Sequence, residues 1–281
     1  MASTRPPVDG RACGGWQPSG WKSISRFVWP KAADGKWIES FDPKFSGGMG
    51  GRAYTTENNA YTYNWDVQHD LAGLTELMGG KDAAEAKLDN LFREDLGRSK
   101  YALFSVFPDS TAMVGQFSMG NEPSFATPYI YNHLGAPWKT QKRIRQLLEY
   151  AFTDTLHGIP GDEDGGGMSA FVVFSMMGFY PVVPGVPVYE LGSPVFDKVT
   201  LEMTNGNRLQ LNANGTSRDH KYIRSVKLNG KPGNALWFSH SDVLNGLNID
   251  LEMSDTPDKT LGQAPADLPP SRITLDPRQF Q

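Results

Sequence analysis

The spacing of apolar residues changes near Pro184, and this change restricts the possible folds more than any other feature of the chain. Before it, apolar residues recur every three or four positions, as they do on one face of an α-helix. After it, apolar and polar residues alternate, as in half-buried β-strands. A chain that places its helices before its strands is typical of an α+β fold. We therefore predict a helical body followed by a C-terminal, antiparallel β-sandwich-like region, with the boundary near residue 185.

The individual elements follow from the same spacing. Residues 140–156 give the clearest helix, with a basic first turn and with Gly158 as its stop. Residues 169–179 are apolar almost all round, which predicts a helix that is buried on most sides. Asn205-Gly206 and Asn229-Gly230 are typical of hairpin turns. We expect further helices over 58–77 and 83–96, and strands over 186–191, 198–203, 208–213, 222–228 and 248–253.

Both ends of the chain differ from this regular middle. Residues 1–50 are rich in glycine, proline and tryptophan and show little periodicity, so we expect an irregular segment there. Residues 257–281 contain five prolines and no periodic pattern, which predicts a disordered tail. The expected organisation is therefore an irregular segment at 1–50, a helical region at 51–184, a strand region at 185–256 and a tail at 257–281.

Composition narrows the classes of partner. A net charge of −4 gives no electrostatic footprint for nucleic acid. No apolar run approaches the roughly 18 residues that a membrane span needs, so we expect neither nucleic acid nor a membrane as a partner. The single cysteine, Cys13, excludes an internal disulfide framework. The N-terminus lacks the apolar region of a secretory signal, and one glycosylation sequon begins at Asn214, so the sequence leaves the compartment open.

An acidic loop precedes the apolar helix expected over 169–179. Asp162, Glu163 and Asp164 stand between the turn Pro160-Gly161 and a run of three glycines. Carboxylates packed this densely repel one another, and they suit general bases, metal ligands or acceptors for sugar hydroxyls. The alternative is a solvated acidic loop at the start of a helix, where the helix dipole favours negative charge.

Two further segments of the helical region bear acids in unusual surroundings. Glu57 is followed by Tyr61 and Trp65, and apolar aromatic surroundings favour the protonated form of a carboxyl group, as a general acid requires. Aromatic faces also stack on sugar rings. Asn121-Glu122 precedes a proline and offers hard oxygen ligands for calcium on a rigid turn. The plainer alternatives are a helix-capping glutamate at Glu57 and an ordinary helix start at Asn121.

Together these segments resemble glycoside hydrolase family 92, the calcium-dependent exo-acting α-mannosidases. The resemblance extends from about Phe41 to Met203 in the order that the family has. It is carried by these runs: Glu57–Trp65, His69–Leu74, Gly120–Ser124, Pro137–Gln141, Gly161–Gly165, Met168–Ala170, Gly178–Gly185 and Leu191–Pro194.

The resemblance implies a fold that this chain contains in part. Family members have an N-terminal β-sandwich, a linker, an (α/α)6 barrel and C-terminal strands. The N-terminal sandwich and the first barrel helices have no counterpart in this sequence. We therefore expect an incomplete (α/α)6-type barrel followed by the C-terminal strands, as in a fragment of such an enzyme.

The resemblance also assigns roles to residues. Glu57 is expected to be the general acid, Asp164 the general base and Asp162 its supporting carboxylate. Asn121 and Glu122 are expected in a calcium site that grips the 2- and 3-hydroxyls of mannose. The family inverts configuration, so acid and base should lie about 6.5–9.5 Å apart to admit a water molecule. Residues expected to contact substrate nearby are Trp65, His69, Asp70, Met168 and Ser169.

The sequence departs from the family pattern at several positions beside these residues. Phe125-Ala126 stand where histidines are expected, and Gln68 stands where a proline is expected before His69. Gly167 replaces an expected glutamine, and Phe171 an expected tryptophan. Fewer polar groups near the metal would weaken calcium or sugar binding, while the candidate acid and base are intact.

Three functions are compatible with this sequence. The first is hydrolysis of terminal α-linked mannose, of the α-1,2 type, from glycans or mannoproteins. The second is an inactive fragment or glycan-binding remnant of such an enzyme. The third is another inverting glycosidase or a phosphorylase on the same helical body. A phosphorylase would need cationic residues in place of the base, so the acidic loop disfavours it.

Overall fold

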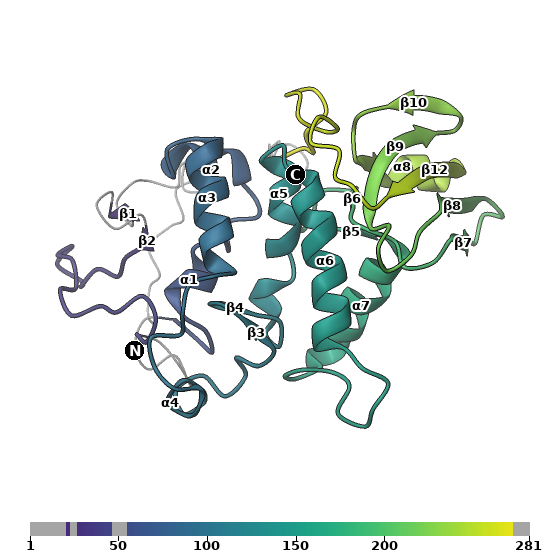
Figure 1. Ribbon diagram of the computed structural model, residues 1–281. Helices are drawn as coiled ribbons and strands as arrows, with labels where there is room; N and C mark the ends of the chain where they lie inside the picture. Colours follow the sequence, from purple (N-terminus) through teal and green to yellow (C-terminus); the bar gives the residue numbers. More distant parts are fainter. Residues whose placement is uncertain (1–20, 23–26, 47–54, 272–281) are drawn as a thin grey trace, which may run out of the picture.

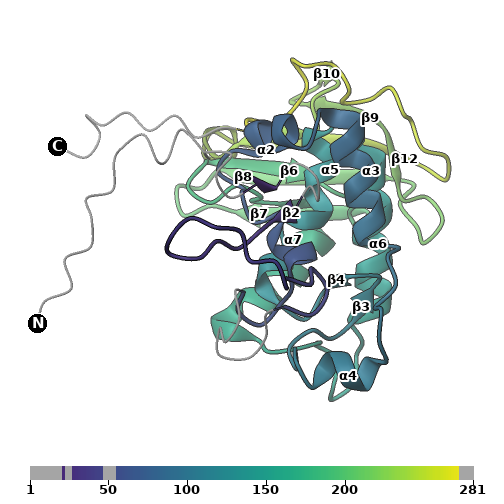
Figure 2. The same ribbon diagram turned by 90° about the vertical axis from the view of Figure 1, so that its left-hand side faces the viewer.

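The helical part and the strand part lie side by side, and the chain crosses from one to the other near residue 180 (Figure 1). The computed structural model describes residues 21–22, 27–46 and 55–271. Much of the segment expected to be irregular at 1–50 lies outside these ranges. Within them, no helix is long and apolar enough to cross a membrane. In Figure 2 the helical part faces the viewer and the strands lie behind it.

The helical part consists of short helices rather than a few long ones. The expected helix over 58–77 is wrong, because the chain leaves the helix at Asn64 and starts a new one after Asp70, whose side chain accepts a hydrogen bond from the Gly73 N–H. The helices are α1 (Ala60–Tyr63), α2 (Leu71–Leu77), α3 (Lys81–Leu91), α4 (Lys100–Phe104), α5 (Ile130–His133), α6 (Pro137–Ala151), α7 (Gly167–Met177) and α8 (His240–Leu244), with 3-10 turns η3 (Glu122–Ser124), η4 (Thr127–Tyr129) and η5 (Asp164–Gly166).

Helix α6 is confirmed, but it begins and ends earlier than the sequence predicts. Phe152 takes an extended conformation and ends the helix six residues before Gly158, which was the expected stop. The reason is tertiary packing: the Phe152 ring lies 6.2 Å from the ring of Phe171. Leu156, which the helical spacing placed in the helix, is 95% exposed in the following loop.

Helix α7 is present, but it is less buried than its apolar sequence predicts. Met168, Phe171 and Ser175 face the helical core. Ser169, Ala170 and Val173 are exposed, with Val173 at 55%, while Phe174 and Met177 pack against the core of the strand part. Gly178 has φ +100° and ends the helix in the left-handed conformation that favours glycine.

The strand part is mainly a five-stranded sheet with the order β10-β9-β12-β8-β7, beside a smaller sheet β11-β6-β5. The prediction that it is antiparallel is wrong at one position: β12 pairs with β8 in parallel. The last strand enters the middle of the sheet after the crossover through α8, and alternation of residues does not reveal a partner's direction. The strands are β1 (Trp21–Lys22), β2 (Phe27–Val28), β3 (Met113–Val114), β4 (Phe117–Ser118), β5 (Phe179–Tyr180), β6 (Val188–Leu191), β7 (Lys198–Glu202), β8 (Arg208–Asn214), β9 (Tyr222–Leu228), β10 (Lys231–Gly233), β11 (Trp237–Ser239) and β12 (Leu247–Ser254).

Both predicted hairpin turns are confirmed. Asn205-Gly206 joins the antiparallel pair β7 and β8, and Asn229-Gly230 joins β9 and β10. Asn229 and Gly230 have φ values of +49° and +76°, as a type I′ turn requires at both central positions.

Two hydrophobic cores meet along α7. One fills the helical part, and the other fills the strand part. Buried polar contacts also join the parts: His133 Nε2 of α5 lies 2.6 Å from Glu190 Oε1 of β6, and Arg145 Nη1 of α6 donates to the Pro194 carbonyl at 2.6 Å. The described helices do not by themselves establish a barrel, so the incomplete (α/α)6 barrel stays a prediction.

The segment after residue 256 was expected to be a disordered tail, and up to residue 271 this is wrong. Leu261 is buried, the Trp237 indole donates to the Asp267 carbonyl at 3.1 Å, and the Leu71 N–H donates to the Ser271 carbonyl at 3.0 Å. The prolines and the missing periodic pattern misled the prediction, because both also suit an ordered chain without regular structure. Residues 272–281 lie outside the described ranges.

Candidate active site

Two glycines bring the acidic loop against the Asn121-Glu122 turn. A Cβ atom on Gly161 would lie 2.0 Å from the carbonyl oxygen of Gly120, which no real side chain tolerates. A Cβ atom on Gly120 would in turn lie 3.1 Å from the backbone nitrogen of Gly161, and 2.2 Å from Thr111 Oγ1. The two backbones are therefore in direct contact, and glycine at both positions makes this contact possible.

Glu57 joins the same site through Asn121. Asn121 Nδ2 donates a hydrogen bond to Glu57 Oε2 at 3.2 Å. Glu57 is not a helix cap, because the N-cap of α1 is Asn59, whose side chain accepts from the N–H groups of Tyr61 and Thr62. The structure thus disfavours the plainer interpretation of Glu57. Its φ of +62° is the left-handed conformation, which glutamate rarely adopts.

The turn at Asn121 and Glu122 is also more than a helix start. Asn121 precedes η3, yet its side chain does not cap that turn. Instead Asn121 is 1% exposed and has both ends of its amide engaged: Nδ2 with Glu57, and Oδ1 with Asn58 Nδ2 at 3.3 Å. Of the two predicted calcium residues, Glu122 has a side-chain oxygen without a hydrogen-bond partner, whereas each polar side-chain atom of Asn121 has one.

The acidic loop divides its roles among its three acids. Glu163 Oε1 accepts a hydrogen bond from the Ser169 N–H at 3.2 Å, so this residue serves the start of α7, as the plainer interpretation predicts. Asp162 and Asp164 are exposed. Asp164 has φ +42°, between the tight turn at Gly161 and the glycines that follow.

Asp109 is an acid of this site that the sequence analysis missed. Its pKa is raised by burial and, in addition, by the negative charges of Asp162, Glu57 and Asp164. The segment Phe107-Pro108-Asp109 has no motif, and nothing in its spacing points to the site. Its place became evident only from the fold, which puts the Asp109 carbonyl oxygen 3.1 Å from the Cβ position of Gly120.

A calcium ion fits the charge of this site. Glu122 Oε1 is buried and has no hydrogen-bond partner. The pKa of Glu122 is raised by burial and by the charges of Asp164 and Glu57, so a nearby cation would be stabilised. Among the described residues, however, no group of three or more acids, histidines or cysteines is arranged as a metal site. Among the described residues, the structure therefore offers Glu122 as a single oxygen donor to such an ion.

The residues expected to contact substrate differ in accessibility. Trp65 and Met168 are 2% and 0% exposed and belong to the helical core, so a sugar cannot reach them directly in this conformation. Asp70 caps α2 by accepting from the Gly73 N–H at 2.9 Å. His69 and Ser169 are exposed.

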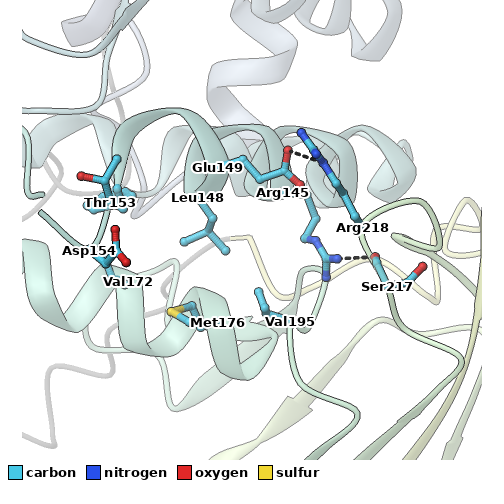
Figure 3. A pocket seen from close by; sticks show the side chains of 11 residues that line it. Arg145, Leu148, Glu149, Thr153, Asp154, Val172, Met176, Val195, Ser217 and Arg218 are labelled. Atoms are coloured by element: carbon cyan, nitrogen blue, oxygen red, sulfur yellow. Dashed lines mark hydrogen bonds and ion pairs between the residues drawn. The ribbon is translucent and has the colours of Figure 1, made fainter.

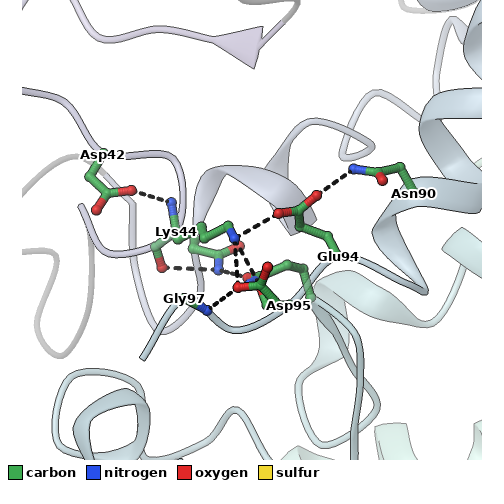
Figure 4. A network of polar contacts seen from close by, with 8 residues as sticks. Asp42, Lys44, Asn90, Glu94, Asp95 and Gly97 are labelled. Atoms are coloured by element: carbon green, nitrogen blue, oxygen red, sulfur yellow. Dashed lines mark hydrogen bonds and ion pairs between the residues drawn. The ribbon is translucent and has the colours of Figure 1, made fainter. Parts of the chain in front are cut away.

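A polar network anchors the chain that leads into Glu57 (Figure 4). Lys44 Nζ lies 2.7 Å from Glu94 Oε1 and 3.2 Å from Asp95 Oδ1. Burial alone would lower the pKa of Lys44, but these two carboxylates raise it. The Lys44 carbonyl and Gln116 Oε1 both accept from Asn59 Nδ2, at 3.1 and 2.8 Å. The cap of α1, two residues after Glu57, is therefore tied to both flanking segments.

Three departures from the family pattern form one cluster beside Glu122. The rings of Phe125 and Phe171 stack with their centroids 5.3 Å apart. A Cβ atom on Gly167 would lie 3.3 Å from the Phe125 ring and 3.7 Å from Glu122 Cγ. A side chain at position 167 would crowd this ring pair, so glycine there leaves room for the stacked rings of Phe125 and Phe171.

A separate groove of about 750 Å³ lies between α6 and α7 (Figure 3). Its walls combine apolar side chains such as Leu148 and Met176 with the ion pair Arg218–Glu149 at 3.5 Å. No residue predicted for catalysis or for metal binding lines this groove.

Comparisons with known proteins agree on one family. The model of the glycosyl hydrolase family 92 catalytic domain matches residues 11–255. An uncharacterized secreted glycosidase of Arthroderma benhamiae is 31% identical over 255 residues, which are 87% of this chain and 30% of that protein.

Solved structures give the same result. A family GH92 α-mannosidase from Bacteroides thetaiotaomicron in complex with mannoimidazole is similar with a TM-score of 0.81 and 28% identity, over 90% of this chain and 33% of that one. A family GH92 inverting mannosidase from the same organism has a TM-score of 0.77 and 35% identity, over 90% of this chain and 34% of its own. The chain thus spans about a third of the length of these relatives.

Proposed function

The chain belongs to glycosyl hydrolase family 92, and we propose that its acidic site hydrolyses terminal α-linked mannose, of the α-1,2 type, from glycans or mannoproteins. The observation that supports this most is the meeting of three distant segments at Glu57, Asn121-Glu122 and Asp162–Asp164. The similar structures include an α-mannosidase bound to mannoimidazole and an inverting mannosidase, which agrees with the substrate and the stereochemistry proposed.

The proposed reaction uses one carboxyl group on each side of the scissile bond. Glu57 donates its proton to the glycosidic oxygen as the bond between that oxygen and the anomeric carbon breaks. Asp164 removes a proton from a water molecule, whose oxygen attacks the anomeric carbon from the opposite face. Asp162, two residues earlier in the same loop, is the supporting carboxylate of Asp164. The left-handed backbone of Glu57 and Asp164 fits this role, since strained conformations concentrate at functional residues.

Calcium is the expected cofactor, because the family is generally calcium-dependent. We assign Glu122 as the residue of this chain that holds it, on the evidence of its unpartnered Oε1. When bound, the ion would bind the hydroxyls of the sugar and offset the negative charge of the site. Asn121 orients Glu57 through the hydrogen of its Nδ2.

A glycan-binding protein without catalysis is the second candidate. The observation that favours it is the apolar cluster of Phe125, Gly167 and Phe171 beside Glu122, which offers fewer polar partners to a sugar. Such a protein would bind mannose-terminated oligosaccharides and release none.

The two candidates are separated by a hydrolysis assay. Mannose release from α-1,2-mannobiose is measured with calcium and with a chelator, and ¹H NMR identifies the first-formed anomer. If the protein is an inverting α-mannosidase, β-mannose should be the first product, and Glu57→Gln and Asp164→Asn should lose turnover. Glu163→Gln is the matched control, since Glu163 lies in the same loop but bonds to the Ser169 N–H. Binding of the disaccharide without turnover would select the second candidate.

A further inference from the structure

The carboxyl group of Glu57 is the end of a chain of buried amides. Asn121 Nδ2 donates to Glu57 Oε2 at 3.2 Å, and Asn121 Oδ1 accepts from Asn58 Nδ2 at 3.3 Å. Asn58 Oδ1 accepts from the Thr62 hydroxyl at 3.0 Å. Asn58, Thr62 and Asn121 are each at most 2% exposed, so water cannot readily replace these partners.

The direction of every bond in this chain is set by one backbone group. Asn58 Oδ1 also accepts from the N–H of Asn59 at 2.9 Å, and a backbone N–H can only donate. Asn58 must therefore present its oxygen to Asn59 and its nitrogen to Asn121. Asn121 must then present its oxygen to Asn58 and its nitrogen to Glu57. Neither side-chain amide can therefore rotate by 180° without losing a hydrogen bond of this chain.

The fixed direction has a consequence for the two carboxyl oxygens of Glu57. Oε2 receives a hydrogen from Asn121, so it acts as an acceptor and is a poor site for a proton. The proton of the carboxylic acid is thereby kept on Oε1. A general acid needs its proton on the oxygen that faces the leaving group, because transfer requires a direct hydrogen bond.

We propose that Asn58 is a positioning residue that acts through Asn121 to place the acidic proton on Oε1 of Glu57. The inference rests on the role proposed above for Glu57. In the reaction, the O–H bond at Oε1 breaks and the proton forms a bond to the glycosidic oxygen. That oxygen takes the electron pair of the broken bond to the anomeric carbon. The carboxylate left on Glu57 is then stabilised by the same Asn121 hydrogen.

The variant Asn58→Asp reverses the chain with almost no change in shape. An aspartate keeps the acceptor for the Asn59 N–H and the Thr62 hydroxyl, but it offers Asn121 a second acceptor in place of a donor. The Asn121 amide then turns its nitrogen toward position 58 and its oxygen toward Glu57. The proton of Glu57 moves to Oε2, the oxygen that faces Asn121.

Asn64→Asp is the matched control. Asn64 ends α1, is 0% exposed, and its Oδ1 accepts from the Val28 N–H at 3.2 Å, an acceptor that aspartate keeps. Both variants exchange a buried amide for a carboxylate beside the same short helix, Asn58 before its start and Asn64 at its end. Loss of stability is therefore common to both, and only Asn58→Asp changes the group that faces Asn121.

The test compares two substrates in the 281-residue chain with calcium present. α-1,2-Mannobiose needs protonation of its leaving group, whereas 2,4-dinitrophenyl α-mannoside does not. We expect Asn58→Asp to lower kcat on mannobiose by about 100-fold relative to its effect on the dinitrophenyl substrate, the scale of general acid catalysis. Asn64→Asp should change the two rates equally. An equal loss on both substrates in Asn58→Asp would overturn the proposal.

A second readout separates this inference from the proposed function. The side-chain amide signals of Asn121 in ¹⁵N–¹H spectra, assigned with Asn121→Asp, should shift in Asn58→Asp and stay in place in Asn64→Asp. If wild-type chain turns over neither substrate, the mannosidase proposal fails for this chain, and the spectra still decide whether Asn58 sets the Asn121 amide. Unchanged Asn121 signals in Asn58→Asp would overturn the inference in either case.

Discussion

Replacing Gly161 by alanine should separate the acidic loop from the turn that bears Glu122. Gly161 has φ +67°, and its added Cβ would lie 2.0 Å from the Gly120 oxygen and 2.7 Å from the Gly120 carbon. A carbon–oxygen contact in proteins is normally about 3.3 Å, so one backbone must move by roughly 1.3 Å. The left-handed conformation costs alanine about 1–2 kcal/mol, and overpacking typically adds about 1–3 kcal/mol. We expect a total loss of about 2–5 kcal/mol.

Gly165→Ala provides the control in the same loop. Gly165 has a similar φ of +70°, but nothing lies within 4 Å of its Cβ position. It should therefore lose only the conformational part, about 1–2 kcal/mol. Urea unfolding followed by tryptophan fluorescence gives both values, and their difference isolates the contact between the two backbones.

The same pair of variants tests whether this contact assembles the site. A displaced loop moves Asp162 and Asp164 away from Glu122, so Gly161→Ala should also weaken calcium binding measured by calorimetry. If Gly161→Ala is no less stable than Gly165→Ala, then the two loops are not held together in the way that we describe. The argument from the glycines would then be wrong, whatever the activity of the chain.

Three further predictions concern charged groups. Glu190→Ala leaves His133 buried without its hydrogen-bond partner at 2.6 Å and should cost about 1–3 kcal/mol in urea unfolding; the absence of a measurable loss would contradict a role for this pair in joining the two parts. The pKa of Asp109 is raised above its ordinary value of 3.8, so the protonated carboxyl group stabilises the folded state at low pH and this contribution is lost as the pH rises through the raised pKa. The unfolding free energy of Asp109→Asn minus that of wild type should therefore increase with pH. A difference that does not change with pH would refute this. Lys44→Met should lower stability by about 1 kcal/mol in low salt and by less in high salt, and a loss that ignores salt would show that its ion pairs contribute little.

The elements that the sequence predicted well are those with local causes. The Asn229-Gly230 turn needs two left-handed residues in a row, and few other dipeptides supply them. Helix α6 follows from the spacing of Ile144 and Leu147, which are buried as expected. The errors have distant causes. Phe152 ends helix α6 and packs near Phe171, and β12 pairs with β8 after a crossover. The spacing of apolar residues along the sequence indicates neither contact.

The candidate site was predictable as a set of segments, but not as a set of contacts. The three runs around Glu57, Asn121 and Asp164 stand out by composition. Their connection depends on partners that are 64 residues apart in the case of Asn121 and Glu57. The residues next to Asp109 in the sequence form no motif, so only the folded structure shows that it lies near the other acids.

The backbone conformation of the two proposed catalytic residues, Glu57 and Asp164, shows why residue propensities do not predict such a site. Among the described residues that are not glycine, those with positive φ are Glu57, Ala112, Asp164 and Asn229. Asn229 belongs to a turn that favours this conformation, but glutamate does not adopt it without a cost of about 1–3 kcal/mol. Propensity would place glycine at Glu57, and selection for chemistry would keep the acid. A Glu57→Gly variant should therefore be more stable than Glu57→Ala, since glycine relieves the strain and alanine retains it, while both remove the proposed proton donor. Equal unfolding free energies of these two variants would mean that no strain is stored at this position.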